Sequence, residues 1–348
     1  MYKSNVTLSA QQQVSSILDS MGFSHYGMAK LATPISLSFY KSWLENEYHG
    51  DMEYLRRHLP QKENPIKLLP HASSAIVIGF NYLPHPKKLI NFKRLRVAEY
   101  AAGEDYHIWL KEHLDSIAQK LKEIFPQEEF LSATDSRPIL ERDLAYRAGL
   151  GWVGKNTCVI HQKHGSFFLI GEILTTLDLY TTTVLHPDRC GSCNKCIEAC
   201  PTKALISPLK LDARLCISYL TIESKKIPPL ELRRKIGNHF FGCDICQSVC
   251  PWNIKIFEAN TTESDTKSQY KNELVSDLRF ILHATNSELM KHFANSPLSR
   301  ARGFGLKRNA LIVAANQNIK TLRPEIVALT SDPRLGELAQ WALQQLLN

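Results

Sequence analysis

The chain has 348 residues, of which 44% are hydrophobic and 22% charged, and its formal net charge is +8. This length predicts about two domains that bury a core without disulfides. The composition excludes collagen-like, coiled-coil and disordered chains. No apolar run approaches the ~18 residues that a membrane helix needs, and no secretory signal is visible, so we expect a cytoplasmic protein without a membrane segment.

The first predicted elements are a helix and a buried strand. Ser9 and Gln12 form a capping box ahead of apolar residues at helical spacing, which predicts a helix that ends near Gly22. The β-branched run SAIVIGF at residues 74–80 predicts a buried strand.

A second helix and a second strand follow. Apolar residues recur at helical spacing over residues 110–124 and stop at Pro126, which predicts a helix. The run SFFLIGEIL at 166–174 predicts a strand, after a loop at 149–156 whose glycines suit tight backbone or close approach to a ligand. This order of strand, helix and strand predicts an α/β or α+β layer.

The pattern changes between Cys190 and Pro251, where cysteine runs replace apolar periodicity. One helix is expected inside this region, from Pro228 and Pro229 to Gly237. Helical periodicity then returns, and residues 335–346 predict an amphipathic helix.

The cysteines are the most informative residues. Nine cysteines in a chain without an export signal are expected to be ligands rather than disulfides. Residues 190–201 follow the pattern C-x2-C-x2-C-x3-C-P of bacterial ferredoxins, and residues 243–251 repeat it one cysteine short, which Cys216 can supply. The crossover rule for two-cluster ferredoxins predicts one four-iron cluster on Cys190, Cys193, Cys196 and Cys250, and another on Cys243, Cys246, Cys216 and Cys200.

Two zinc sites are the alternative, but zinc prefers separated C-x2-C pairs, and three cysteines in one loop followed by Cys-Pro fit that poorly. Two neighbouring clusters pass single electrons, and a bare electron carrier would not need the rest of the chain. The pattern therefore predicts an enzyme with a second reaction centre in roughly the first 180 residues.

Several motifs together resemble the epoxyqueuosine reductase family over most of the chain. They are Tyr100 with GEDYH at 103–107, DSRPILER at 135–142, AGLGWVGKN at 148–156, RLCISYLT at 214–221, and GCD at 242–244 running on to CPWN at 250–253. The resemblance implies a cobalamin, two 4Fe-4S clusters, and reduction of an epoxide on the wobble nucleotide of tRNA. It also implies an external low-potential electron donor, flavodoxin- or ferredoxin-like, and we expect a monomer.

The expected fold class is α+β with three domains. These are an N-terminal α/β cobalamin-binding domain at 1–180, a ferredoxin-like two-cluster domain at 181–255, and a C-terminal helical, HEAT-repeat-like segment at 256–348 that contacts tRNA.

Asp135 corresponds to the proton donor of the family. A carboxyl group donates a proton near pH 7 only if its pKa is raised, and Pro138, Ile139 and Leu140 are expected to bury it. Without the resemblance, the residues alone favour a turn or a helix cap at Asp135.

Asp105 and His107 match part of the Asp-x-His-x-x-Gly box that presents a histidine to cobalt in some cobalamin proteins, but Leu110 replaces the glycine. The resemblance thus implies a cofactor without a protein histidine on cobalt, and His107 by itself also fits a structural hydrogen-bonding role. Cys158 is expected to be small and buried, and Lys62 stands where the family often carries arginine. The candidate contacts to cofactor or substrate are Lys62, Tyr106, His107, Asp135, Arg142, Lys155, Asn156 and Ser218.

Residues 290–310 contain five basic residues and no acidic one. Such a stretch suits RNA phosphates, with Phe304 beside them, although a solvated helix face with Phe304 in the core is the alternative. The tRNA substrate implied by the resemblance favours RNA binding. The predicted tRNA contacts are Arg300, Arg302, Lys307 and Arg308, and the predicted rim of the cofactor domain contains Lys93, Arg94 and Arg96.

Two other functions fit parts of the sequence. A reductive dehalogenase would share the cobalamin and both clusters, but the missing export signal and the basic C-terminal stretch disfavour it. A non-catalytic electron carrier or RNA-binding module would use the clusters structurally. We predict an oxidoreductase that reduces epoxyqueuosine to queuosine in tRNA, with electrons from two clusters and a proton from Asp135.

Overall fold

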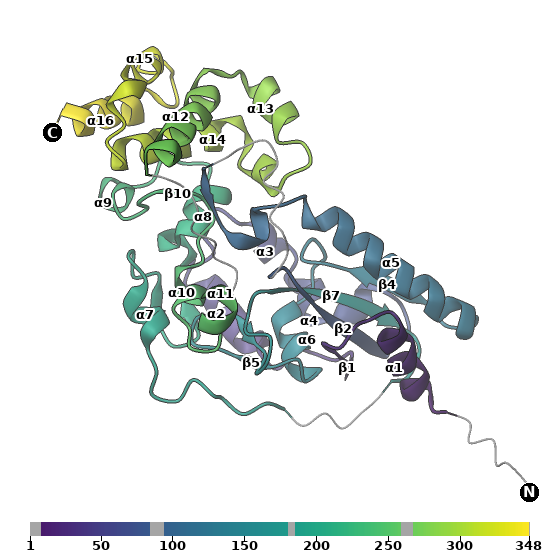
Figure 1. Ribbon diagram of the computed structural model, residues 1–348. Helices are drawn as coiled ribbons and strands as arrows, with labels where there is room; N and C mark the ends of the chain where they lie inside the picture. Colours follow the sequence, from purple (N-terminus) through teal and green to yellow (C-terminus); the bar gives the residue numbers. More distant parts are fainter. Residues whose placement is uncertain (1–7, 84–93, 180–184, 259–266, 348) are drawn as a thin grey trace, which may run out of the picture. The chain divides into compact units, whose positions relative to one another are not determined.

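The structure is a computed structural model that describes residues 8–83, 94–179, 185–258 and 267–347 (Figure 1). The chain divides into two compact units. The first contains Met1–Asn46, Tyr54–Tyr82 and His107–Cys193, and the second contains Glu47–Glu53, Leu83–Tyr106 and Asn194–Asn348. Most of the cysteine region thus shares a unit with the C-terminal helices, and the three-part division at 1–180, 181–255 and 256–348 stays a prediction.

A four-stranded antiparallel sheet forms the centre of the first unit. Its order is β1 (Tyr26–Lys30), β2 (Ser74–Asn81), β7 (Phe168–Thr175) and β4 (Phe130–Ala133). The two strands predicted from the sequence are the two central ones, which explains their apolar runs. Every pairing is antiparallel, as in an α+β fold, so these strands do not form the parallel sheet that an α/β domain implies.

The helices predicted for the first unit are confirmed. Helix α1 (Ala10–Ser20) begins after Ser9, whose capping box with Gln12 is present. Helix α5 (Tyr106–Ile124) starts four residues before the predicted stretch and packs on the sheet, where a Cβ on Gly171 of β7 would lie 2.9 Å from the side chain of Leu114.

Helix α6 (Glu141–Arg147) packs against β7, and its Leu144 joins an apolar cluster with Val77 of β2 and Ala133 of β4. The remaining elements are α2 (Leu37–Glu45), α3 (Tyr54–Arg57), α4 (Leu59–Glu63), η1 (Pro65–Leu68) and the hairpin of β5 (Trp152–Val153) with β6 (Val159–Ile160).

The glycine-rich loop at 149–156 leads into this hairpin. A Cβ on Gly151 would lie 2.1 Å from the carbonyl oxygen of Ile160, so the residue must be glycine for the two backbones to meet. The tight backbone expected of these glycines is therefore confirmed at Gly151, whereas close approach to a ligand stays a prediction.

Short elements connect the cysteines of the second unit. They are β3 (Arg96–Val97), η2 (Glu99–Ala101), α7 (Lys195–Ala199), β8 (Leu205–Ser207), β9 (Lys210–Leu211), η3 (Ala213–Leu215), α8 (Ile217–Ile222), α9 (Leu230–Arg233), β10 (His239–Phe241), α10 (Ile245–Ser248) and α11 (Ile254–Glu258). The helix predicted from Pro228 to Gly237 is only α9, so that prediction is too long. Helices α7, α8 and α10 were not predicted.

The C-terminal part of the second unit is helical, as predicted. Its elements are α12 (Lys267–His283), α13 (Asn286–His292), η4 (Pro297–Ala301), α14 (Arg302–Asn316), η5 (Lys320–Leu322), α15 (Arg323–Ala328) and α16 (Gly336–Leu347). Figure 1 shows these helices gathered together, and α14 packs against α12, α13 and α16. Within the described ranges, no helix combines the length and apolar character needed to cross a bilayer.

Candidate active site

Asp135 lies in the turn that follows β4, the edge strand of the first unit's sheet. The backbone N–H of Arg137 donates to the carbonyl oxygen of Thr134 at 2.8 Å, and the Thr134 and Ser136 hydroxyls are 3.1 Å apart. The turn holds Asp135 just beyond the end of the strand.

The carboxylate of Asp135 pairs with His107 from the first turn of α5. The distance from His107 Nε2 to Asp135 Oδ1 is 2.9 Å, and the two side chains are 21% and 33% exposed. The expected apolar burial of Asp135 is therefore wrong, because the residue projects from a turn toward a polar partner. This pairing fits the hydrogen-bonding role considered for His107, and its contact with a cofactor stays a prediction.

Lys62 lies behind the turn and is buried. Its Nζ donates to the carbonyl oxygen of Ile139 at 2.9 Å and lies 5.6 Å from the centre of the Tyr40 ring. The side chain thus fastens the segment after Asp135 to helix α4. A buried lysine with an internal acceptor acts as a support for the site.

Two glutamates that were not predicted from the sequence lie beside Asp135. Glu172 is 0% exposed in the central strand β7, and both of its carboxyl oxygens lack a hydrogen-bond partner among the described residues. It pairs in register with Ala133, two residues before Asp135. Glu141 begins helix α6. We name Asp135, Glu141 and Glu172 the carboxyl cluster.

The members of this cluster shift one another's protonation. Burial raises the pKa of Glu172 well above its usual range, and the charges of Glu141 and Asp135 raise it further. Removal from water, followed by the charge on Asp135, raises the pKa of Glu141 to about 7, against the opposing effects of Arg142 and Lys62. Burial lowers the pKa of Lys62, opposed by Glu141 and Glu172. The two glutamates therefore hold protons more firmly than ordinary carboxyl groups.

Arg142 and the predicted residues of the glycine-rich segment mainly form hydrogen bonds with backbone atoms. The exposed Arg142 lies 3.2 Å from the Thr157 carbonyl oxygen and 3.3 Å from its hydroxyl. Lys155 Nζ donates to the carbonyl oxygen of Gly191 at 2.7 Å, and the buried Asn156 accepts from the backbone N–H of Cys158. Cys158 itself is partly exposed, so its expected burial is wrong.

Tyr106 and Ser218 belong to the second unit. The buried Tyr106 ring meets Tyr100 edge-on, with ring centres 5.6 Å apart. Ser218 follows Cys216 in helix α8, and a hydrogen bond from its side chain favours the Cys216 thiolate. These contacts give Tyr106 a packing role and place Ser218 beside predicted cluster ligands.

None of the nine cysteines forms a disulfide in the part of the chain that the structure describes. In the second unit, α7, which carries Cys196, packs against α10, which carries Cys246. Burial raises the pKa of Cys216, and the charge on Cys200 raises it further. Burial also raises the pKa of Cys243 to about 12, and the charge on Cys216 contributes to this shift. Three members of one predicted ligand set are therefore electrostatic neighbours. Among the described residues, no three His, Cys, Asp or Glu side chains converge on a single metal ion.

The basic stretch before residue 310 contains one clear error of prediction. Arg308 is 0% exposed and cannot reach a phosphate; its guanidinium donates to the carbonyl oxygens of Ser224 and Lys226 and to the side chain of Asn309. The residue lies on the inner face of α14, where a buried guanidinium satisfies backbone acceptors.

The other basic residues differ in availability. Arg302 is exposed, Arg300 lies 3.8 Å from Glu223 in a partly exposed ion pair, and Lys307 is half-buried. Phe304 lies beside Arg334, whose guanidinium carbon is 3.7 Å from the ring centre, so the aromatic ring is stacked on a cation of its own unit.

The two described arginines of the predicted rim of the cofactor domain are also bonded to side chains of their own unit. Arg94 binds Glu273 at 2.6 Å, and Arg96 donates to Asn238 at 2.9 Å. Lys93 lies outside the described residues. These arginines join segments of the second unit.

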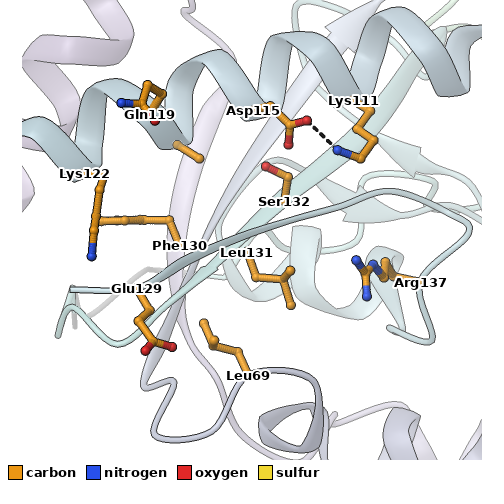
Figure 2. A pocket seen from close by; sticks show the side chains of 11 residues that line it. Leu69, Lys111, Asp115, Gln119, Lys122, Glu129, Phe130, Leu131, Ser132 and Arg137 are labelled. Atoms are coloured by element: carbon orange, nitrogen blue, oxygen red, sulfur yellow. Dashed lines mark hydrogen bonds and ion pairs between the residues drawn. The ribbon is translucent and has the colours of Figure 1, made fainter.

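A pocket of about 480 Å³ lies between α5 and β4 (Figure 2). Lys111 and Lys122 line it from the helix, and Arg137 lines it from the turn. Figure 2 shows Lys111 turned toward Asp115, with which it forms an ion pair. No member of the carboxyl cluster lines this pocket, so it is separate from the candidate site.

Two family models match the chain. Residues 62–136 match "Epoxyqueuosine reductase QueG, DUF1730", a segment that includes Lys62, His107 and Asp135. Residues 189–253 match "4Fe-4S double cluster binding domain", which covers all eight predicted cluster cysteines. The second match supports two iron-sulfur clusters.

Known proteins match nearly the whole chain. The epoxyqueuosine reductase of Pseudomonas aeruginosa is 36% identical over 334 residues, which cover 93% of this chain and 91% of that protein. A crystal structure of epoxyqueuosine reductase with an epoxyqueuosine-modified tRNA-Tyr stem loop is 28% identical, with a TM-score of 0.81 and coverage of 98% and 92%.

A structure of the Bacillus subtilis enzyme, described with its catalytic aspartate loop swung out of the active site, is also 28% identical, with a TM-score of 0.80 and coverage of 97% and 91%. The resemblance seen in the sequence motifs is confirmed, and the chain belongs to the epoxyqueuosine reductase family of oxidoreductases.

Proposed function

We propose that this chain reduces epoxyqueuosine to queuosine in tRNA and that Asp135 donates a proton to the epoxide oxygen. The proposed reaction is supported by the family to which the chain belongs, whose members are named epoxyqueuosine reductase. The observation that carries the assignment of Asp135 is its pairing with His107 in an accessible turn, beside two carboxyl groups with raised pKa values.

The geometry suits a proton donor that must be recharged. One third of the Asp135 side chain is exposed, so a substrate can reach it. After the proton has left, a charge-assisted hydrogen bond from a protonated His107 would stabilise the carboxylate. The hydrogen bond from Lys62 to Ile139 keeps the segment after Asp135 in place.

We infer that the cofactor beside Asp135 is a cobalamin. The side chains that fit this group are partly exposed hydrogen-bond donors, His107 and Arg142, which suit the amide-bearing edge of a corrin. Lys62 and Asn156 would act from behind, because both are buried, and the Lys155 ammonium is already bonded to the Gly191 carbonyl oxygen. When bound, cobalamin supplies a strongly reducing metal centre for an electrophilic carbon.

Two 4Fe-4S clusters would deliver the electrons singly from an external low-potential donor. We assign Cys200, Cys216, Cys243 and Cys246 to one cluster, supported by the electrostatic contacts of Cys216 with Cys200 and Cys243. By the same crossover pattern, the other cluster would use Cys190, Cys193, Cys196 and Cys250.

The proposed substrate is tRNA. Of the four predicted tRNA contacts, the exposed Arg302 and the partly exposed Arg300 are the best placed to meet phosphates, and Lys307 would contribute less because it is half-buried. Arg308 is withdrawn from this set.

The test compares wild type with Asp135→Asn, each reconstituted without oxygen. Both should bind about eight irons and one corrinoid, while the variant should lose about 10²–10⁴-fold in queuosine formation. Asp115→Asn, at an exposed position of α5 where the carboxylate pairs with Lys111, is the control and should keep full activity. An active Asp135→Asn protein would exclude Asp135 as the donor, and a wild type without queuosine formation would refute the proposed reaction.

A further inference from the structure

The proposed reaction consumes more protons than one aspartate carries. Two electrons and two protons convert an epoxide to an alkene and water: both carbon–oxygen bonds break, a carbon–carbon double bond forms, and oxygen leaves as water. The clusters supply the electrons. If Asp135 gives one proton, a second must reach the same oxygen in each turnover. The inference about the source of this second proton rests on the proposed function, the reduction of the epoxide.

Glu172 has the burial expected of an internal proton store. It lies in the centre of the sheet, paired with Val77 on one side and Ala133 on the other, and both carboxyl oxygens are enclosed without a partner among the described residues. An ionised carboxylate is strongly disfavoured in such a place because water cannot solvate its charge, so the protonated form is favoured. Because the oxygens are enclosed, a bound cofactor or substrate would not touch them.

The groups that face Glu172 connect it with the reacting site. Glu141 at the start of α6 interacts electrostatically with both Glu172 and Asp135. Lys62 from α4 interacts with both glutamates, and His107 of α5 and Arg142 of α6 act on Glu141. The strand neighbours, Val77 and Ala133, are apolar. The buried ammonium group of Lys62 therefore interacts with the carboxyl groups of both Glu141 and Glu172.

We propose that Glu172 and Glu141 form a proton reserve behind Asp135, which recharges Asp135 so that the departing oxygen receives its second proton in the same turnover. Glu172 acts through Glu141 and Asp135, and is a positioning residue. The proton leaves the carboxyl O–H of Glu141 for the Asp135 carboxylate, and Glu141, which is partly exposed, takes a proton from solvent after product release.

Two coupled carboxyl groups lose their protons in two steps, and the second loss is displaced to higher pH by the first charge. When one of the two glutamates is replaced by glutamine, the remaining carboxyl group no longer faces that charge and loses its proton at lower pH. The fall in rate on the alkaline side of the pH–rate profile should therefore begin at lower pH.

The experiment measures single-turnover queuosine formation against pH for the reconstituted wild type, Glu172→Gln and Glu141→Gln. Glutamine keeps the volume of glutamate and carries no transferable proton. We expect Glu172→Gln to keep its iron, its corrinoid and its KM for tRNA within about twofold, to lose about tenfold in rate, and to move the alkaline limb down by about one pH unit. Glu172→Asp restores a carboxyl group and should recover part of the rate and of the wild-type profile.

A Glu172→Gln protein with the wild-type alkaline limb would overturn the proton reserve. If that variant does not fold, Glu141→Gln decides in the same way, because Glu141 lies at the start of a helix rather than in the middle of the sheet. Failure of the wild type to make queuosine would instead refute the proposed function, so the two failures are distinguishable.

Discussion

His107 Nε2 lies 2.9 Å from Asp135 Oδ1, which joins the first turn of α5 to the turn after the edge strand β4. The two residues are 28 positions apart, and each comes from a different motif of the sequence. The pair gives the candidate proton donor a fixed orientation although its side chain is partly exposed.

His107→Ala should reduce queuosine formation by about tenfold, because the carboxylate left on Asp135 would lose its charge-assisted hydrogen bond. Folding should change little, since partly exposed pairs contribute about 0–1 kcal/mol. Single-turnover rates at equal corrinoid content provide the measurement. His113→Ala, an exposed position on the same helix, is the matched control, and equal rates for the two variants would contradict a role for His107.

Stability should fall as the pH decreases from about 6.5 toward 5, because a group of stacked histidines is held neutral. The rings of His25, His161 and His164 lie with centres 4.4 to 5.1 Å apart. Burial, with the neighbouring histidines, lowers the pKa of His25 from 6.5 to about 3 and that of His161 to about 4. The unfolded chain therefore binds more protons than the folded chain below pH 6.5, and protonation favours unfolding.

Urea unfolding at pH 7 and pH 5 measures this effect. Wild type should lose about 2 kcal/mol more than His25→Gln over this interval, since 1.36 kcal/mol corresponds to each pH unit between the two pKa values. Glutamine can still donate to the Leu150 carbonyl oxygen that faces His25 Nε2. Identical pH dependence in the two proteins would show that His25 does not titrate on unfolding.

Arg308→Leu should destabilise the second unit by about 3 kcal/mol, because the buried carbonyl oxygens of Ser224 and Lys226 would lose their donor. Arg308→Lys should not restore full stability, since an ammonium group cannot reproduce the planar array of donors. Urea unfolding with Arg302→Leu as the exposed control measures the difference. Equal stability of the Arg308→Leu and Arg302→Leu proteins would contradict this structural role of the buried guanidinium.

Replacing Arg300 and Arg302 by glutamine should weaken tRNA binding and reduce the slope of log affinity against log salt by about 1 for each phosphate that the variant no longer neutralises. Titrations at several salt concentrations measure both quantities. Lys320→Gln, an exposed position in the same unit, is the control. An unchanged slope in the double variant would mean that other residues of the chain bind the phosphates.

Local patterns in the sequence were enough for the elements with strong periodicity. The capping box at Ser9, the apolar strand at 74–80 and the amphipathic helix at 335–346 are found where they were predicted, because capping and burial act over a few neighbouring residues. The helix expected from Pro228 to Gly237 is too long because proline and glycine mark only its outer limits. Helix α9 covers Leu230–Arg233, and residues 234–237 form turns.

The sequence by itself identified the family and predicted eight cysteines as cluster ligands, since motif spacing is written along the chain. Only the tertiary structure decided that Arg308 is buried, that Asp135 faces His107, and that Glu172 lies enclosed in the sheet beside Ala133. The physical reason is that burial and electrostatic environment depend on which distant segments pack together, and a charged residue looks the same in the sequence whether solvent or a sheet surrounds it.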